Sequence, residues 1–222
     1  MNAKLDFSAV FARWPELLFG LGNTVLLALA GMALALAIGI AGVVIRRLDR
    51  PAASMLVDGF VETIRNTPFL VQIFFIYFAL PLLGIRLGAT VTAILALGLN
   101  GGAYAIEIIR GGVDAIPKGQ WEASESLAFS YWEQMRYVIL PQAFRIALGP
   151  TVGFMVQIVK NTSVTALIGF VELTRAGQLM NSMTFQPFHV FLTVAALYFL
   201  VCYPLSFWSE KLKGKPDVRP AH

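Results

Sequence analysis

An uninterrupted apolar stretch at 24–45, "TVLLALAGMALALAIGIAGVVI", most strongly constrains what this chain can fold into. A helix needs about 20 consecutive apolar residues to cross a bilayer, and it can do so because it satisfies its own backbone hydrogen bonds. Only 14% of the 222 residues are charged and the mean hydropathy is +0.70, whereas about a quarter of the residues in soluble domains are charged. The sequence therefore predicts an all-α integral membrane protein.

Hydropathy divides residues 1–222 into one transmembrane domain with about five spans. We expect the spans at about 23–45, 58–83, 88–113, 143–164 and 188–209. The first span lacks the basic leader and small-residue cleavage site of a signal peptide, so we expect it to be retained. Polar groups interrupt the second and fourth spans, which is tolerated where a helix is buried or lines a cavity. Glycines four residues apart, at 98 and 102 and at 149 and 153, favour close helix packing.

The distribution of Lys and Arg between the spans predicts the orientation. One set of alternate segments carries eleven of these residues and the opposite set carries five. Because cytoplasmic loops carry the positive excess, we expect the N-terminus outside and the C-terminus in the cytoplasm. The net charge of +4 has the same explanation, and we expect no nucleic-acid partner. The larger set is Arg46, Arg47, Arg50, Arg110, Lys118, Arg136, Arg145, Lys211, Lys213, Lys215 and Arg219, and the smaller is Lys4, Arg13, Arg86, Lys160 and Arg175.

The loop between the third and fourth spans, at about 117–141, has a strong helical signature. It contains "EASESLAFSYWEQMRYVILP", in which Ser130 precedes Glu133 by three residues. Ser-x-x-Glu is a capping box that starts a helix. We therefore expect two short helices separated by a turn at 128–130, with the second ending at Pro141 because proline interrupts helical hydrogen bonding.

The first of these short helices carries Glu122 and Glu125 beside apolar residues. A helix held away from the membrane by two spans suits docking into the groove of a partner protein. The alternative is a helix lying on the bilayer surface, which normally has a basic polar face. The acidic face favours docking on a partner.

This loop resembles the EAA loop of ABC-importer permeases, whose pattern is Glu-Ala-Ala, three residues, Gly, nine residues, Ile, one residue and Leu-Pro. The corresponding residues here are Glu122, Ala123, Ser124, Ala128, Val138, Leu140 and Pro141. The third, glycine and isoleucine positions depart from the pattern. If the turn needs a left-handed residue, alanine at 128 costs about 1 kcal/mol relative to glycine, which would favour a shift of the turn by one residue.

The flanking sequences extend the resemblance over about residues 15–210 and place it in the polar-amino-acid branch of that family. They are "RNTPFLVQIFFIYF", "AYAIEIIRGGVDAIPKGQWEA", "LPQAFRIALGP" and "VKNTSVTALIGFVELTRAGQ". The resemblance implies that the loop is a coupling helix, which transmits the closure of ATPase subunits to the spans. The residues it assigns to this coupling are Glu122, Ala123, Ser124, Glu125, Leu127 and Ala128.

The resemblance also implies partners. They are two ATP-binding cassette subunits, which bind ATP and Mg, a second permease of the same or similar sequence, and an extracytoplasmic substrate-binding protein. The expected location is a bacterial cytoplasmic membrane, with lipid around the spans. The chain has no phosphate-binding Gly-x-x-x-x-Gly-Lys-[Ser/Thr] loop, since its only Gly-Lys pair precedes Pro216. We therefore expect no enzyme activity and no cofactor in this chain.

Other function classes are less compatible with the residue pattern. No Ser/His pair, paired Asp or metal-ligand set lies at membrane depth, so we expect no catalytic or metal site. The single cysteine, Cys202, excludes a disulfide framework. The remaining alternative is a secondary transporter or channel driven by an ion gradient, for which an acidic docking helix would have no use.

Polar residues within the spans are candidates for the substrate pathway, because such residues are costly in lipid. At 160–163 a break in the helix would also expose backbone groups, as transporter sites often do. Each candidate has a structural alternative. Glu107 pairs with Arg110 one turn on, Asn100 bonds between helices, the group at 65–68 forms a kink, and the group at 160–163 forms a polar loop at the outer interface. No carboxylate occurs between 133 and 172, which favours a neutral or acidic amino acid as substrate. The pathway candidates are Thr67, Gln72, Asn100, Glu107, Lys160, Asn161, Thr162 and Ser163.

Overall fold

The computed structural model of the chain describes residues 7–47 and 50–213, and this part is helical without any strand. Within it, four helices are long and apolar enough to cross a membrane, and a bent helix pair makes a fifth span if it is counted as one. The predicted all-α membrane architecture is confirmed. The helices are α1 (Ser8–Phe11), α2 (Trp14–Arg46), α3 (Pro51–Arg65), α4 (Phe69–Phe74), α5 (Ala89–Asp114), α6 (Lys118–Ser126), α7 (Tyr131–Glu133), α8 (Leu140–Thr162), α9 (Leu173–Thr184) and α10 (Pro187–Leu212).

Four short turns of altered pitch extend these helices. The π-helical turn η1 (Phe75–Ala79) and the 3₁₀ turn η2 (Leu80–Leu83) follow α4, the π-helical turn η3 (Gln134–Ile139) joins α7 to α8, and the 3₁₀ turn η4 (Ser163–Ile168) follows α8. Three of the residues counted to predict the orientation, Lys4, Lys215 and Arg219, lie outside the described residues.

The helices α2, α5 and α10 correspond to the first, third and fifth predicted spans. Helix α2 contains the whole of 23–45 and begins earlier, with Pro15 in its first turn, a position where the missing amide of proline costs nothing. Helices α5 and α10 match 88–113 and 188–209 to within three residues at each end. Long apolar runs thus located these spans correctly.

Small residues bring the helices together, as the glycine spacing predicts. Gly98 and Gly102 lie against α2, where a Cβ on Gly102 would come within 2.5 Å of Cγ2 of Ile38. Gly149 and Gly153 lie in the same way against the last turns of α10. Contacts this close leave no room for a side chain, and they join α2 to α5 and α8 to α10 along several turns.

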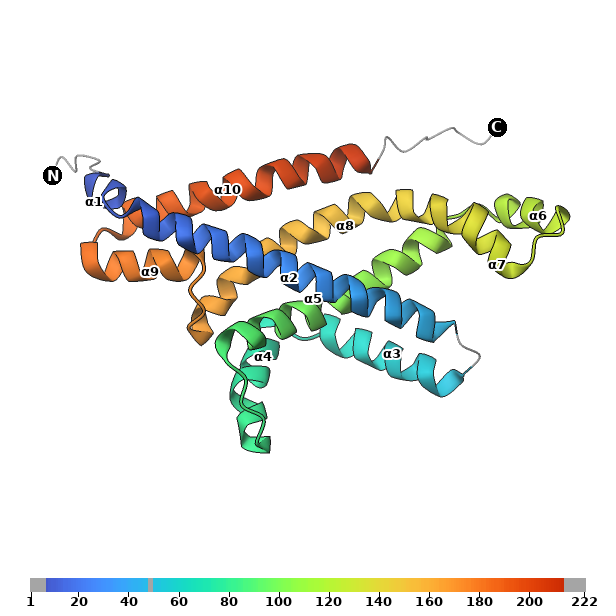
Figure 1. Cartoon of the computed structure of the whole chain (residues 1–222), viewed down its shortest axis with the longest axis horizontal. Helices are drawn as coiled ribbons and strands as arrows, with labels where there is room; N and C mark the ends of the chain where they lie inside the picture. The colour runs from blue at the N-terminus through green and yellow to red at the C-terminus, as the bar shows by residue number, and fades with distance from the viewer. Residues whose placement is uncertain (1–6, 48–49, 214–222) are drawn as a thin grey trace.

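The second predicted span, 58–83, is broken at the predicted interruption, and its two segments make one span only if the bent pair is counted together. Helix α3 begins at Pro51 and ends at Arg65, and the following helical segment turns away from it by 107°. Pro68 causes the break, because proline has no amide hydrogen and disfavours helical backbone at Thr67. The side chains of Asn66 and Thr67 donate hydrogen bonds to carbonyls of the last turn of α3 and so cap the broken end. Figure 1 shows α4 projecting out of the bundle below this break.

The fourth predicted span is confirmed as a candidate span, but the polar group at 160–163 does not interrupt its helical segment. The helical segment runs from Tyr131 to Ile168 through Pro141 and Pro150. Pro141 does not end the second short helix, because the wider turn η3 directly precedes it and relieves the clash between the proline ring and the preceding turn. The polar group at 160–163 is part of the helix rather than a loop, and η4 then tightens the last turns.

The long helices α2, α5, α8 and α10 run along the length of the molecule (Figure 1). The hairpin formed by α6 and α7 lies at one end, and α1 and α9 lie at the other. The two ends of the bundle therefore carry different short elements.

Candidate functional site

The hairpin of α6 and α7 has the local structure that its sequence predicts. Helix α6 starts after Pro117 and ends at Ser126, and the left-handed residue Ala128, whose φ is 57°, follows two positions later. The amide of Ala128 donates to the carbonyl of Glu125, and that of Phe129 donates to Ser124, which is the hydrogen-bond pattern of a Schellman motif. Alanine therefore occupies the position that favours glycine, and the turn has not shifted along the chain.

The second half of the hairpin begins with the predicted capping box. The backbone amide of Ser130 donates to the Glu133 carboxylate at 2.8 Å, and both partners of the box are present. The hairpin is fixed to the bundle by a buried apolar cluster in which Trp121 packs against the ends of α5 and α8. The members of this cluster are Val113, Ile116, Met135, Ile139 and Ala143, with Trp121 and Val138 at its edge.

Five of the six predicted coupling residues are exposed on the hairpin: Glu122, Ala123, Glu125, Leu127 and Ala128. Ser124 is different, because it is 2% exposed and donates a hydrogen bond to the carbonyl of Trp121. Its side chain faces the interior of the hairpin, which explains why a small residue stands at this position and shows that it offers no surface to a partner.

The hairpin also exposes large apolar side chains. Leu127 is 70% exposed and Trp132 is 79% exposed. Sequence reasoning missed Trp132, because the exposed side of such a short helix depends on how the hairpin packs against the bundle. Acidic and apolar side chains together form an outer surface of the kind that fits a partner's groove.

A second site is a polar pocket of about 410 Å³ between α5, α8 and the break that follows α3. Three of the predicted pathway residues line it: Thr67, Asn100 and Asn161. Gln72 does not line the pocket but joins two of these residues, since its amide donates to Thr67 Oγ1 at 2.9 Å and its carbonyl accepts from Asn100 at 2.9 Å. The predicted bonding of Asn100 between helices is therefore confirmed.

The opposite wall of this pocket comes from α8. The Gln157 amide donates to Asn161 Oδ1 at 3.1 Å, and the rings of Tyr104 and Phe154 stack with their centroids 5.1 Å apart. Pro68 and Phe69 complete the lining. The residues that line the pocket offer side-chain amides, the hydroxyls of Thr67 and Tyr104, and aromatic faces, and none of these residues is charged.

The other residues of the group at 160–163 do not reach this pocket. Lys160 is exposed outside it. Thr162 is fully buried and Ser163 half-buried, and each donates its hydroxyl to a carbonyl one turn earlier, on Val159 and Lys160. The predicted cluster is divided because consecutive residues of a helix point in different directions.

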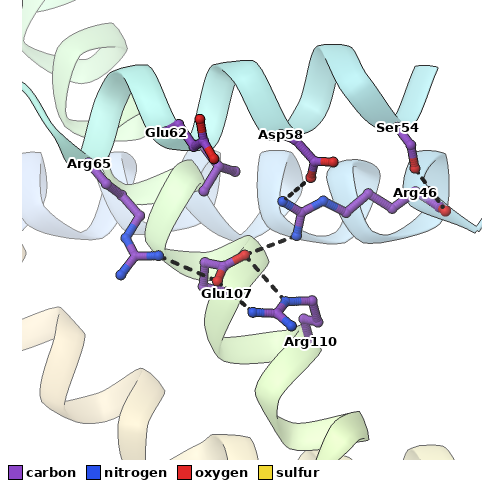
Figure 2. Close-up of a pocket in the computed structure, with 8 residues that line it drawn as sticks. Arg46, Ser54, Asp58, Glu62, Arg65, Glu107 and Arg110 are labelled. Atoms are coloured by element: carbon purple, nitrogen blue, oxygen red, sulfur yellow. Dashed lines mark hydrogen bonds and ion pairs between the residues drawn. The ribbon is translucent and has the colours of Figure 1, made fainter. Parts of the chain in front are cut away.

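A third site surrounds Glu107 at the end of α5 nearer the hairpin, beside a pocket of about 520 Å³ (Figure 2). The predicted ion pair with Arg110 is present at 2.8 Å. The carboxylate also pairs with Arg46 of α2 at 2.9 Å and with Arg65 of α3 at 3.4 Å. Glu107 therefore joins three helices and offers no free carboxylate to a substrate.

Further charges complete this cluster. Arg46 also pairs with Asp58 of α3, and Arg110 pairs with Asp114 at 3.1 Å. The guanidinium of Arg65 also lies 5.6 Å from the ring centroid of Tyr104, which lines the polar pocket. The sequence could suggest only the Arg110 pair, because Arg46 and Arg65 are distant from Glu107 along the chain.

A buried carboxylate at the opposite end of the molecule was not predicted. Glu172 is fully buried, where its side chain caps α9 by accepting the amides of Thr174 and Arg175 at 2.9 and 2.8 Å and the hydroxyl of Tyr198 at 2.6 Å. Burial raises the pKa of Glu172, while these hydrogen bonds act to lower it. The amide of Leu173 donates to Thr24 Oγ1, so this end of α9 is tied to α2 and α10.

Comparison with known proteins places these features in one family. The family model of the binding-protein-dependent transport system inner membrane component matches residues 34–213. The glutamine transport system permease protein GlnP of Escherichia coli (strain K12) is 37% identical over 97% of this chain and 99% of its own length. The L-cystine transport system permease protein TcyB of Bacillus subtilis (strain 168) is 30% identical over 92% of this chain and 88% of its own length.

Solved structures agree with the sequence comparison. The crystal structure of an amino acid ABC transporter with histidines superposes with a TM-score of 0.90 at 30% identity, covering 95% of this chain and 98% of that one. An inward-facing structure of the MetNI methionine ABC transporter superposes with a TM-score of 0.65 at 20% identity, covering 96% of this chain and 98% of that one. The second likeness concerns the fold alone.

Proposed function

Because this chain belongs to the family of binding-protein-dependent transport system inner membrane components, we propose that it is the permease subunit of an ATP-driven ABC importer of amino acids. The cargo class is supported by the named relatives, which are permeases for glutamine and cystine. The candidate spans support a multi-pass protein, and the bacterial relatives support the cytoplasmic membrane as its location.

The observation that carries the proposal is the hairpin of α6 and α7. It lies at one end of the bundle, is anchored by the cluster around Trp121, and presents Leu127 and Trp132 beside acidic residues. We assign this end to the cytoplasm, with the N-terminus outside and the C-terminus inside. The hairpin then docks on an ATP-binding subunit, and closure of the ATPases moves the spans through it.

The importer requires partners that supply the other functions. Two ATP-binding cassette subunits bind ATP and Mg and carry out hydrolysis, and an extracytoplasmic binding protein delivers the substrate. A second permease, of this or a similar sequence, completes the pathway. The segment after the α3 break supports such a contact, because it projects from the bundle with Phe75, Phe78 and Leu82 between 58% and 86% exposed.

The polar pocket between α5 and α8 favours a neutral amino acid. Its amides and hydroxyls fit a neutral polar side chain, whereas a cationic side chain would find no carboxylate among the lining residues. An acidic side chain would find no free cation, because Arg65 pairs with Glu107 and Lys160 lies outside the pocket. The expected cargo is therefore neutral rather than acidic.

The proposal is tested by uptake into liposomes that contain this chain with its ATPase subunits, its binding protein and ATP. Glutamine serves as the neutral probe, with glutamate and arginine for comparison. We expect uptake of glutamine only when both ATP and the ATPase are present. Uptake driven by a sodium or proton gradient without the ATPase would instead identify a secondary transporter.

A further inference from the structure

Two adjacent arginines at the end of α2 point to different elements. In the sequence, Arg46 and Arg47 count only as positive charges that set the orientation. In the structure, the Arg46 side chain is 17% exposed and turns toward α3 and α5, where Figure 2 shows it between Asp58 and Glu107. The last turn of α2 is thus held by the charged cluster.

Arg47 turns toward the hairpin instead. Its Nη1 donates to the hydroxyl of Tyr131 at 2.6 Å and lies 4.0 Å from Sδ of Met135. Tyr131 is the first residue of α7, and Met135 lies in η3. The end of α2 therefore touches the hairpin directly, although 84 residues separate the two partners of the hydrogen bond.

The two arginines connect α2 to the hairpin in different ways. Arg47 bonds directly to α7, whereas Arg46 pairs with Glu107 of α5, seven residues before that helix ends at Asp114 and leads toward α6. Glu107, the partner of Arg46, also pairs with Arg65, so ion pairs to one carboxylate join α2 and α3 to α5. Displacement of the hairpin would therefore act on α2 and α3 as well as on the two helices to which the hairpin is covalently joined.

We propose that Arg46 and Arg47 are positioning residues that make α2 and α3 follow the hairpin during the transport cycle. The inference rests on the proposed function, since it requires an ATPase that moves the hairpin. The positive-inside rule explains these charges by the orientation of the chain alone and treats every arginine in the segment alike. The proposed role instead distinguishes Arg46 and Arg47 from the others. The polar pocket is bounded by the break after α3, so helices coupled in this way would change its shape.

Arg50 provides a matched control. It belongs to the same positive segment, and among the described residues it forms no side-chain hydrogen bond or ion pair. Arg50→Gln removes the same charge as Arg47→Gln without removing a described contact. Tyr131→Phe gives a second approach, because it removes only the hydroxyl that accepts from Arg47 and leaves the charge of α2 unchanged.

The experiment measures uptake and ATP hydrolysis together in liposomes that contain the complete importer. We expect Arg46→Gln, Arg47→Gln and Tyr131→Phe each to lower the glutamine imported per ATP hydrolysed by about fivefold or more, the scale of a coupling energy between sites. The double variant of Arg47 and Tyr131 should be no worse than either single one, since both remove the same hydrogen bond. Arg50→Gln should remain within about twofold of the original protein.

Two results would overturn the inference. One is an equal loss of glutamine imported per ATP in the Arg50, Arg46 and Arg47 variants, which would show that only the positive charge of these residues matters and not their contacts. The other is normal import per ATP in Tyr131→Phe, and this variant alone decides the role of Arg47 if Arg47→Gln fails to assemble in size-exclusion chromatography. Failure of the proposed function is distinguishable, because the unmodified importer would then show no ATP-dependent uptake.

Discussion

Replacement of Ala128 by glycine should stabilise the hairpin, because Ala128 is held at a φ of 57°. The left-handed conformation costs a residue with a Cβ about 1–2 kcal/mol. Glycine removes this strain but gains about 0.4–1 kcal/mol of conformational freedom in the open chain. The midpoints of these two ranges leave a net stabilisation of about 0.8 kcal/mol, which corresponds to about a fourfold shift in the opening equilibrium.

Hydrogen exchange of the segment 120–130 in lipid nanodiscs measures this shift directly, because local opening exposes the amides of α6. Ala128→Gly should slow exchange by about fourfold. Ala123→Gly is the matched control: it makes the same change inside exposed helix α6, where glycine costs about 0.5–1 kcal/mol and should speed exchange. Unchanged or faster exchange in Ala128→Gly would show that no strain is stored in this turn.

Three further predictions concern the pocket, the packing and the buried carboxylate. Asn161→Asp should lower glutamine uptake by about tenfold, because it places a charge among neutral partners, whereas Lys160→Gln, one residue away but outside the pocket, should leave uptake unchanged. Gly39→Ala should lower the melting temperature in detergent, since its Cβ would lie 2.6 Å from the Cβ of Ala105 in α5. Gly22→Ala should not, since in the described part of the chain its Cβ would meet no atom beyond its own stretch of α2 within 4 Å. Burial raises the pKa of the Glu172 carboxyl, so the folded protein binds a proton there more tightly than the unfolded chain does. Ionisation of Glu172 therefore destabilises the folded state. This loss of folding stability is absent below the ordinary pKa of 4.5 and grows as the pH rises toward the folded pKa. Glu172→Gln should therefore flatten the fall of melting temperature with rising pH above 4.5, and an unchanged slope would contradict this assignment.

Features set by local sequence were predictable. Long apolar runs located α2, α5 and α10, and the spacing of Ser130 and Glu133 predicted the capping box that starts α7. The pair of Glu107 and Arg110 followed from their i,i+3 spacing. Each of these depends on residues within one or two helical turns.

Features set by tertiary contacts were not predictable from one sequence. Pro68 marked a break, but the 107° bend depends on what packs around it. Pro141 looks like a helix terminus, yet the helix continues through it after a widened turn. The contacts of Arg46 and Arg47 join segments far apart in the chain, so the sequence alone shows these two arginines only as positive charges in a loop.

The proposed function requires the hairpin of α6 and α7 to be the surface through which an ATPase moves this membrane domain. A photo-crosslinking residue at Leu127 tests it most directly in the assembled importer, with the same residue at Phe185 as the control. Both positions are exposed, at 70% and 83%, and they directly follow α6 and α9, which lie at opposite ends of the molecule (Figure 1). We expect light to join the ATPase subunit to position 127, with a yield that changes when ATP is added, and not to position 185. Crosslinking to the ATPase at 185 with none at 127 would contradict this expectation.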